Sequence, residues 1–563
     1  MKWLGLGGLA AIAAGALAGT AAADGDRELV IGVSQYPSNL NPLTEAHVVQ
    51  SYIHGMTRRP FTAYGPDWEG HCFLCTALPS VADGTAEIRD IPAELGGGRG
   101  WAATYTIDPA AQWADGVPIT TEDVLFTWEV GRHPQSGTIN FELFANDIVA
   151  IDVRDDKTFT IQWDKVSCGF ELINNFELVP AHLERALFEA EPSAYAERSL
   201  YETDPTNPGL WFGPYVLSDI EFGGEITMTR NPLWWGEQPW FDTIRVRPIE
   251  STPALEANLL AGEIDMIAGE DGISIDQAIA FEENHGDEYD VIFKPALFHE
   301  HIDLNLDNPI LADLRVRQAL IHAIDRQTIS DRLFAGHQPV STGPVNPQDS
   351  VYFDGVPTYA FDPARAAQLL DEAGWTFRPD ADIRTNAAGE PLALTIMTTA
   401  GNATRELVEQ VLQSQWRRAG IDVTVKNEPA RVLFGETLAR RDFDAMIMFA
   451  WLSSPENIPR TTLHSTMIPT EANNWAGQNY PGYVSAEMDE VIDALETTCD
   501  DPEKQALWDR LQTVYATDLP VLPLYYRAQP FILPLWLDGV TPTGHMDPST
   551  LYVEHWRRND GGQ

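Results

Sequence analysis

The chain has 563 residues and a formal net charge of −47 at pH 7, from 83 acidic and 36 basic side chains. A chain this acidic repels nucleic acid and anionic membrane surfaces, so nucleic-acid binding is excluded as a function. The length exceeds what one hydrophobic core supports, and we therefore expect two or three domains.

The first 23 residues have the pattern of a cleavable secretory signal. Lys2 is their only charged residue, an apolar segment runs from Leu4 to Ala18, and three alanines precede Asp24. No cysteine stands at the end of this segment, where a lipid anchor would need one, and no later stretch is apolar for long enough to cross a bilayer. We predict a signal peptide at residues 1–23 and an exported, soluble mature protein.

Four cysteines, Cys72, Cys75, Cys168 and Cys499, are too few for a disulfide scaffold in a chain of this length. The first two lie in the order His-Cys-x-x-Cys, which is not the order of covalent haem attachment. No second Cys-x-x-Cys completes a four-cysteine zinc site. A local disulfide between them is the expectation in an oxidising compartment, and an incomplete metal site is the alternative; the pairing of all four is left open.

A strand is predicted from Glu28, and it ends at a turn rich in Pro and Asn. Loops at the carboxyl ends of strands line the ligand crevice of α/β proteins, so Gln35 and Tyr36 are candidate ligand contacts. The alternative is that these two residues only turn the chain.

Residues 60–200 have the pattern of a mixed α+β insert. Alternating hydrophobicity at 104–107 and 158–163 predicts antiparallel strands, and Thr120 with Asp123 predicts a capping box at the start of a helix. The Gly-rich segment 87–100 is predicted to be a loop, and it lacks the Lys-Ser/Thr ending of a phosphate-binding loop.

The segment 303–336 predicts a strand followed by two helices. Asp313 and Asp325 stand at the N-cap positions, and Gly336 ends the second helix. Apolar residues form one stripe along the first helix, which leaves three polar residues elsewhere on its surface. These are Arg315, Arg317 and His322.

In the second half of the sequence, the residues that begin and end helices and strands are easier to recognise. Asp362 and Gly374 bound a predicted helix. A strand at 392–400, a helix at 404–420 and a strand at 421–425 predict a parallel βαβ unit. A buried strand is predicted at 443–451, a turn-rich region follows it, and 519–536 is again strand-like although it contains prolines.

Eight segments in this order resemble the family 5 bacterial extracellular solute-binding proteins, the receptors of dipeptide, oligopeptide and nickel ABC importers. The segments are LNPL at 40–43, DGVPITTEDVLFTWE at 115–129, GPYVL at 213–217, LAGEIDMI at 260–267, LRVRQALIHAIDR at 314–326, FDPARAAQLLDEAGW at 361–375, RRAGIDV at 417–423 and LPLYYR at 522–527. The family usually has Asp where this chain has Asn41.

The resemblance implies an α/β, two-lobed periplasmic-binding-protein-like fold with an extra mixed α+β domain inserted in the first lobe. The first lobe would comprise 24–65, 201–297 and 528–563, with the insert at 66–200, and the second lobe 298–527. The chain would cross between the lobes near 297–301 and near 526–528.

The implied function is that of a periplasmic substrate-binding component, which traps a peptide or peptide-like solute between its lobes and delivers it to an inner-membrane ABC permease. Such a protein is not an enzyme, needs no cofactor or bound metal, acts as a monomer and touches the membrane only through the permease. In the resemblance, the end of the strand at Trp451 and the second crossover lie beside the ligand. The predicted ligand-binding residues are Gln35, Tyr36, Trp451, Ser453, Asn474, Trp475, Tyr525, Tyr526 and Arg527. Arg527 could hold a carboxylate with two hydrogen bonds.

One departure from the family pattern bears on the ligand. Peptide-binding members carry an Asp shortly after the Trp of this strand, as partner of the peptide's amino terminus. Here Ser453 and Ser454 follow Trp451 and cannot supply the charge, although Glu456 could supply it from a different position. A metal chelate, a sugar or an opine is therefore an alternative ligand.

Two further alternatives concern the histidines and cysteines. A metal site could use His71 with Cys72 and Cys75, or the pair His299 and His301. An exported hydrolase is a remote alternative, because the chain lacks both the His-Glu-x-x-His motif and the Gly-x-Ser-x-Gly nucleophile elbow.

Overall fold

The computed structural model describes residues 27–559 apart from 38, 45–46, 142, 250, 380, 430–431, 439, 474, 476 and 500. The predicted signal peptide and the predicted contact Asn474 lie outside the described residues. Within the described part of the chain, none of the helices combines the length and the apolar composition needed to cross a membrane.

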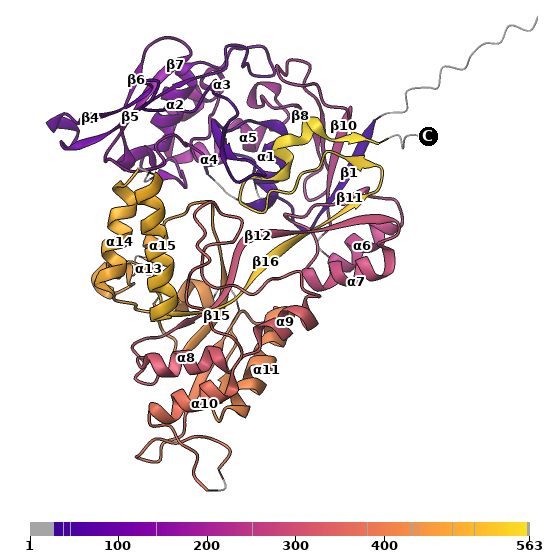
Figure 1. Cartoon of the computed structure of the whole chain (residues 1–563). Helices are drawn as coiled ribbons and strands as arrows, with labels where there is room; N and C mark the ends of the chain where they lie inside the picture. The colour runs from indigo at the N-terminus through magenta and orange to yellow at the C-terminus, as the bar shows by residue number, and fades with distance from the viewer. Residues whose placement is uncertain are drawn as a thin grey trace, which may run out of the picture.

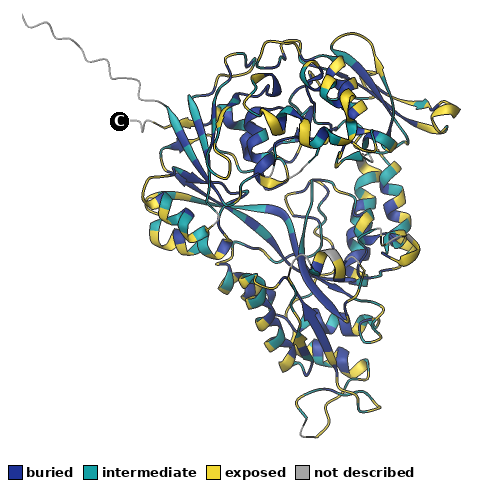
Figure 2. Cartoon of the chain, turned by 180° about the vertical axis from the view of Figure 1, so that it is seen from behind, coloured by how far each residue is buried: buried dark blue, intermediate teal, exposed yellow. Residues whose placement is uncertain are grey.

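One ten-stranded mixed sheet runs through both halves of the molecule, in the order β14-β13-β15-β12-β16-β11-β1-β10-β9-β8. Its two central strands, β12 (Tyr289–Leu304) and β16 (Val521–Pro534), are the longest and pair antiparallel. They pass from the upper half of the molecule to the lower half in Figure 1 and are mostly buried, as Figure 2 shows. We call this ribbon of two strands the crossover.

The other strands of the large sheet are β1 (Glu28–Val33), β8 (Tyr215–Ile220), β9 (Ile226–Arg230), β10 (Thr243–Pro248), β11 (Met266–Ile267), β13 (Ala393–Met397), β14 (Asp422–Val425) and β15 (Met446–Leu452). The smaller sheets contain β2 (Thr62–Tyr64), β3 (Gly70–Cys72), β4 (Ala86–Asp90), β5 (Arg99–Thr106), β6 (Ile148–Val153), β7 (Thr158–Trp163), β17 (Leu537–Asp538) and β18 (Arg557–Arg558). The α-helices used below are α1 (Val48–Thr57), α2 (Thr121–Gly131), α3 (Ala181–Ala190), α6 (Thr252–Leu260), α7 (Ile275–His285), α8 (Leu314–His322), α9 (Arg326–Leu333), α10 (Pro363–Glu372), α11 (Ala403–Arg418), α13 (Arg460–Leu463), α14 (Ala486–Thr497) and α15 (Asp501–Asp518).

The upper half contains the start of the chain and the insert. β1 pairs parallel with β10 and β11. Its inward residues Leu29, Ile31 and Val33 join a core that also contains α1 and the sheet β4-β5-β7-β6 of the insert. Helices α6 and α7 cover a separate cluster on the large sheet.

The insert confirms two sequence predictions and corrects a third. β5 and β7 are antiparallel, and Thr120 and Asp123 form the capping box of α2. The prediction that 87–100 is a loop throughout is wrong, because both ends of this segment are strands, β4 and β5, which form a hairpin. Cross-strand pairing, which the Gly-rich composition hides, orders these ends.

The lower half confirms the predicted βαβ unit, since β13 and β14 are parallel and α11 connects them. Asp313 and Asp325 cap α8 and α9 by accepting the backbone N–H groups of Arg315 and Thr328. Arg317, which the pattern places off the apolar stripe of this helix, is nevertheless withdrawn from solvent. Its guanidinium is buried and donates to the carbonyls of Asp518 and Leu519, which the end of α15 would otherwise leave without partners.

Helices α14 and α15 form a hairpin that the sequence analysis does not predict. Their apolar faces pack together around Trp508, and the hairpin reaches the insert (Figure 1). A disulfide joins Cys168 of the insert to Cys499 in the loop between the two helices, and the Cys168 N–H donates to the carbonyl of Glu496. A second disulfide joins Cys72 to Cys75, as expected.

The pairing of the crossover strands is interrupted at one place. The register shifts between the pairs Pro295–Ala528 and His299–Tyr526, and Ser453 reaches in to donate its N–H to the carbonyl of Leu297. Such an irregularity increases local twist and gives a sheet a place to bend. The division into lobes at these residues stays a prediction.

The long-range disulfide leads to a stability prediction. Cys168 and Cys499 are 331 positions apart, so their bond restricts the unfolded chain far more than the Cys72–Cys75 bond, which spans 3 positions. The double variant Cys168→Ser/Cys499→Ser should lose roughly 6 kcal/mol of unfolding free energy on the chain-entropy model. Cys72→Ser/Cys75→Ser is the matched control and should lose much less. Equal losses in calorimetry of the two variants would contradict this.

Candidate functional site

Two cavities lie on opposite faces of the crossover. His299 pairs with Trp451 and Tyr526, whereas its neighbour Glu300 pairs with Ala450 and Tyr525. Consecutive side chains of a strand point to opposite faces, so these two groups are separated by the sheet itself. One face opens into a cavity of about 130 Å³, the Trp451 cavity, and the other into a cavity of about 280 Å³, the crossover cavity.

The Trp451 cavity is lined by Trp451 and Trp508 and by several uncharged polar side chains. Trp451, at the end of β15, is stacked on Tyr480 with the ring centroids 6.1 Å apart and meets the edge of Phe449. The hydroxyl and amide groups that line the cavity are those of Ser453, Ser454, Asn457, Thr461, Thr462 and Gln478. This lining suits a small solute with an apolar part and several hydrogen-bonding groups.

Asp349 is the acid that lines this cavity, and among its described lining residues there is no Lys or Arg. Its carboxylate accepts the backbone N–H groups of Glu456 at 2.9 Å and Val351 at 3.3 Å. Burial raises the pKa of Asp349 to about 6. A buried carboxylate held in this way is a ready partner for a cationic group of a ligand.

Sequence reasoning missed Asp349 because it lies in a turn, more than a hundred residues before Trp451. The turn signals around Pro347 indicate only a loop, and nothing local indicates which part of the fold that loop faces. The sequence alternative, Glu456, lies nearby but is already paired within the protein, since Lys504 Nζ is 2.5 Å from its Oε2 and Ser350 Oγ donates to its Oε1.

The charges beside this cavity act on Tyr64 of β2, in the upper half of the molecule. Burial raises the pKa of the Tyr64 phenol, and the charge of Glu456 adds to the effect, followed by Glu171 and Asp349. Tyr64 therefore lies within electrostatic reach of the acids beside the Trp451 cavity. The residues that line the cavity itself all come from the segment 297–508.

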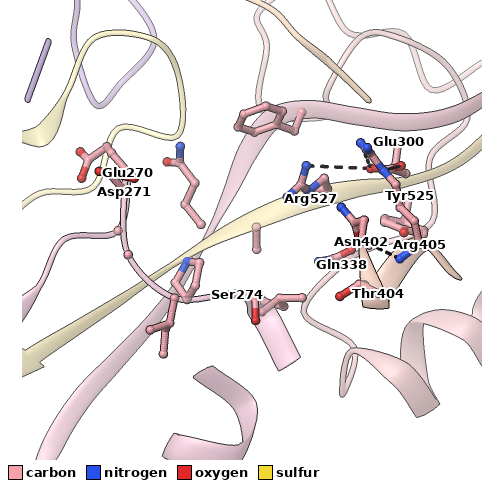
Figure 3. Close-up of a pocket in the computed structure, with 18 residues that line it drawn as sticks. Glu270, Asp271, Ser274, Glu300, Gln338, Asn402, Thr404, Arg405, Tyr525 and Arg527 are labelled. Atoms are coloured by element: carbon pink, nitrogen blue, oxygen red, sulfur yellow. Dashed lines mark hydrogen bonds and ion pairs between the residues drawn. The ribbon is translucent and has the colours of Figure 1, made fainter. Parts of the chain in front are cut away.

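The crossover cavity contains Tyr525 and Arg527, two of the predicted ligand contacts (Figure 3). Glu300 is buried beside them and accepts from Arg405 Nε at 2.6 Å and Nη2 at 3.4 Å. Arg527 Nη1 is 4.0 Å from the same carboxylate. The predicted residues are thus divided, with Trp451 and Ser453 at one cavity and Tyr525 and Arg527 at the other.

The remaining predicted contacts have other surroundings. Gln35 donates through its backbone and its side-chain amide to Asp271, which lines the crossover cavity, and half-buried Tyr36 packs against the core of the upper half. The hydroxyl of buried Tyr526 donates to the carbonyls of Gly343 and Val345. Trp475 is 37% exposed.

The histidines near the crossover are engaged with protein groups. His299 Nε2 is 3.1 Å from the hydroxyl of Ser341, which is fully buried, and His301 Nδ1 is 2.8 Å from the carbonyl of His299. Burial, then the charges of His301 and Arg326, lower the pKa of His299. A hydroxyl sealed from solvent has no access to a substrate, which argues against the arrangement of a hydrolase nucleophile.

Cys72 and Cys75 form a disulfide, so neither has a free thiolate with which to bind a metal ion. His71 instead contacts Asp67, at 2.9 Å from its Oδ1. Across the described residues, no three side chains of His, Cys, Asp or Glu are grouped so that they could hold a metal ion.

Comparisons with known proteins agree with the resemblance found in the sequence. The family model described as bacterial extracellular solute-binding proteins, family 5 Middle, matches residues 100–469. A Brucella ovis protein named as a candidate ABC transporter peptide-binding protein is 30% identical over 278 residues, 48% of this chain, so the chain matches about half (49%) of that relative's length. The oligopeptide-binding protein AppA of Bacillus subtilis is 26% identical over 466 residues, 82% of this chain and 81% of AppA.

A solved structure extends the comparison to the fold. The oligopeptide-binding protein of Thermus thermophilus, in complex with a pentapeptide, superposes with a TM-score of 0.70 and 26% identity, over 94% of this chain and 96% of that one. The predicted two-lobed α/β fold is confirmed.

The raised pKa of Asp349 leads to a pH prediction. The folded state holds the proton of Asp349 more tightly than the unfolded chain does, because the pKa of this carboxyl is near 3.8 when the chain is unfolded. The protonated carboxyl therefore adds its full contribution to the free energy of unfolding below pH 3.8, and this contribution is lost as pH rises through about 6. The unfolding free energy of the wild type relative to Asp349→Asn should therefore fall by up to about 3 kcal/mol between pH 4 and pH 7. Denaturant unfolding at several pH values measures it, with exposed Asp354→Asn as control; a difference that is constant with pH would contradict the prediction.

Proposed function

The chain belongs to family 5 of the bacterial extracellular solute-binding proteins, and on that premise we propose that it is the receptor of an ABC importer and holds a peptide-like solute in the Trp451 cavity. The solute would be captured in the periplasm by a monomer and delivered to an inner-membrane permease. In this proposal the first lobe comprises 24–65, 201–297 and 528–563, with the insert at 66–200. The second lobe is 298–527.

One observation carries the proposed ligand class: the buried carboxylate of Asp349 lines the same cavity as Trp451, and the described lining of that cavity has no Lys or Arg. A free ammonium group would satisfy this carboxylate, and the ring of Trp451, held in place by stacking on Tyr480, would pack against an apolar side chain. Asp349 thus supplies the charge that Ser453 and Ser454 cannot. The amide and hydroxyl lining provides partners for peptide groups.

The mechanism needs no covalent chemistry. A solute that contacts both lobes stabilises only the conformation in which both contacts exist, and this differential affinity is what shifts the equilibrium toward closure. The permease would then recognise the closed form. The irregular pairing beside His299 gives the crossover strands the place to bend.

A ligand library with Trp451→Ala tests the proposal. A short peptide should raise the unfolding midpoint of the wild type without being converted, because a ligand that binds only the native state stabilises it by mass action. Trp451→Ala should lower the affinity by about tenfold or more and leave the midpoint without ligand nearly unchanged. Trp475→Ala, at an exposed tryptophan, is the comparison variant, and its peptide affinity and unfolding midpoint are measured in the same way.

Three outcomes would contradict the proposal. A midpoint rise with sugars, opines or nickel chelates but not with peptides would transfer the function to the alternative ligand classes. Turnover of a bound compound would indicate the hydrolase. A large fall of the midpoint in ligand-free Trp451→Ala would mean that this tryptophan serves the core.

Asp349→Asn tests the role of the carboxylate. Peptides with a free amino terminus should lose about tenfold or more in affinity, whereas their N-acetylated forms should lose little, because only the former present a charge. The wild-type affinity for free peptides should also fall as the pH is lowered through about 6, where Asp349 becomes neutral. Titration calorimetry of the four combinations measures both effects, and an equal loss for free and acetylated peptides would exclude this pairing.

A further inference from the structure

The crossover cavity has hydrogen-bonding groups that the fold itself leaves unused. It is the larger of the two cavities at about 280 Å³, and it lies on the face of β12 and β16 away from Trp451. Both halves of the chain line it: the segment 269–275 from one, and Gln338 with the start of α11 from the other. Figure 3 shows these groups arranged around the crossover strands.

Positive charge exceeds negative charge at the crossover end of this cavity. Two guanidinium groups, those of Arg405 and Arg527, surround the single carboxylate of Glu300. Arg405 donates hydrogen bonds to that carboxylate. Arg527 is 4.0 Å from it and lies over the ring of Phe298, 5.0 Å from the ring centroid. The Arg527 donors are therefore available to an anion, and its planar fork matches a carboxylate.

A buried amide provides independent support for a ligand. Gln338 is 2% exposed and lines the cavity, and its Oε1 has no hydrogen-bond partner. Buried polar side chains normally have partners, and an orphaned one needs an explanation. The oxygen and nitrogen of such an amide exchange places by a flip of the group, so Gln338 can donate to an anion or accept from a cation.

The helix α11 adds to the positive potential. Its N-cap Asn402 and its first-turn residue Thr404 line the cavity, and the N-terminus of a 16-residue helix favours a negative charge. Thr404 also hydrogen-bonds Asp276 of α7, 3.4 Å away, so the two halves meet at this rim.

The rest of the lining limits what the anion can carry. Apolar walls come from Ile273, Phe298 and Pro530. Glu270 and Asp271 lie at the opposite end from Arg527 (Figure 3), where they would repel a second carboxylate. The cavity therefore fits a single carboxylate on a short apolar body whose far end is neutral or cationic.

We propose that the crossover cavity is a second binding site, separate from the Trp451 cavity, for a small monocarboxylate of the free amino-acid type, held through Arg527 and Gln338. This site goes beyond the proposed receptor function, which concerns the opposite face of the crossover. Because its walls come from both lobes, an occupant would stabilise their present arrangement and so favour capture of solute at the Trp451 cavity.

Titration calorimetry of the dialysed full chain with four probes tests the site: L-leucine, 4-methylpentanoate, L-leucinamide and succinate. We expect L-leucine and 4-methylpentanoate to bind, and we expect at least tenfold weaker binding of L-leucinamide, which lacks the carboxylate, and of succinate, which has two. Arg527→Gln should lose L-leucine binding by about tenfold or more. Arg418→Gln, at an exposed arginine, is the matched control and should bind as the wild type does.

Trp451→Ala separates this site from the receptor site. The variant should keep its affinity for L-leucine while it loses affinity for peptide, because the two cavities lie on opposite faces. The proposal is overturned if L-leucine does not bind at millimolar concentration, if L-leucinamide binds equally well, or if Trp451→Ala rather than Arg527→Gln abolishes L-leucine binding. None of these results would alter the test of peptide binding.

Discussion

The antiparallel pairing of β12 with β16 is the constraint on which the rest of the structure depends. These strands belong to the sheet of both halves, so the halves are joined by a hydrogen-bonded ribbon and not by flexible linkers. The alternation of side chains along the ribbon then creates two different surfaces only one residue apart in sequence. His299 and Tyr526 belong to the surface of Trp451, and Glu300 and Arg527 belong to the other.

Charge is distributed unevenly in relation to these surfaces. The chain is strongly acidic, yet the Trp451 cavity is lined by a single acid, Asp349, and the crossover cavity by three acids and two arginines. Asp349 is held by backbone N–H groups, and Glu300 is held by Arg405. Most of the acidic residues can therefore serve solubility, while individual carboxylates and guanidinium groups, withdrawn from water, acquire the stronger interactions that selective binding requires.

The contacts between the halves are not confined to the crossover. The bond between Cys168 and Cys499 ties the insert to the α14–α15 hairpin, and on the other face α7 meets Thr404. Any movement of one lobe relative to the other must therefore leave the Cys168–Cys499 disulfide and the pairing of β12 with β16 intact. A tethered opening would be smaller than one about the crossover strands alone, because the disulfide limits the separation of the elements it joins.

Much of the fold could be predicted from local patterns. The caps at Asp313 and Asp362, the βαβ unit around α11 and the strand at 443–451 each follow from signals within a few residues, and the eight family segments supplied the order of the elements. The hairpin of α14 and α15 was missed although Ser485 caps a regular apolar spacing from Met488 to Leu495, a signal that was present. The strands at the ends of 87–100 and the burial of Arg317 carried no such signal, because partners distant in sequence stabilise them.

The sequence by itself determined the class of the protein, the elements with strong caps and periodicity, and the aromatic and charged residues worth testing. Only the tertiary structure decided which of these residues share a cavity, because that depends on strand register and on loops brought together from distant parts of the chain. Arg527 and Tyr526 are neighbours in sequence but face opposite sides of a sheet, whereas Asp349 and Trp451 are about a hundred residues apart and line one cavity. A local pattern contains neither relation, since each is set by pairing across the whole fold.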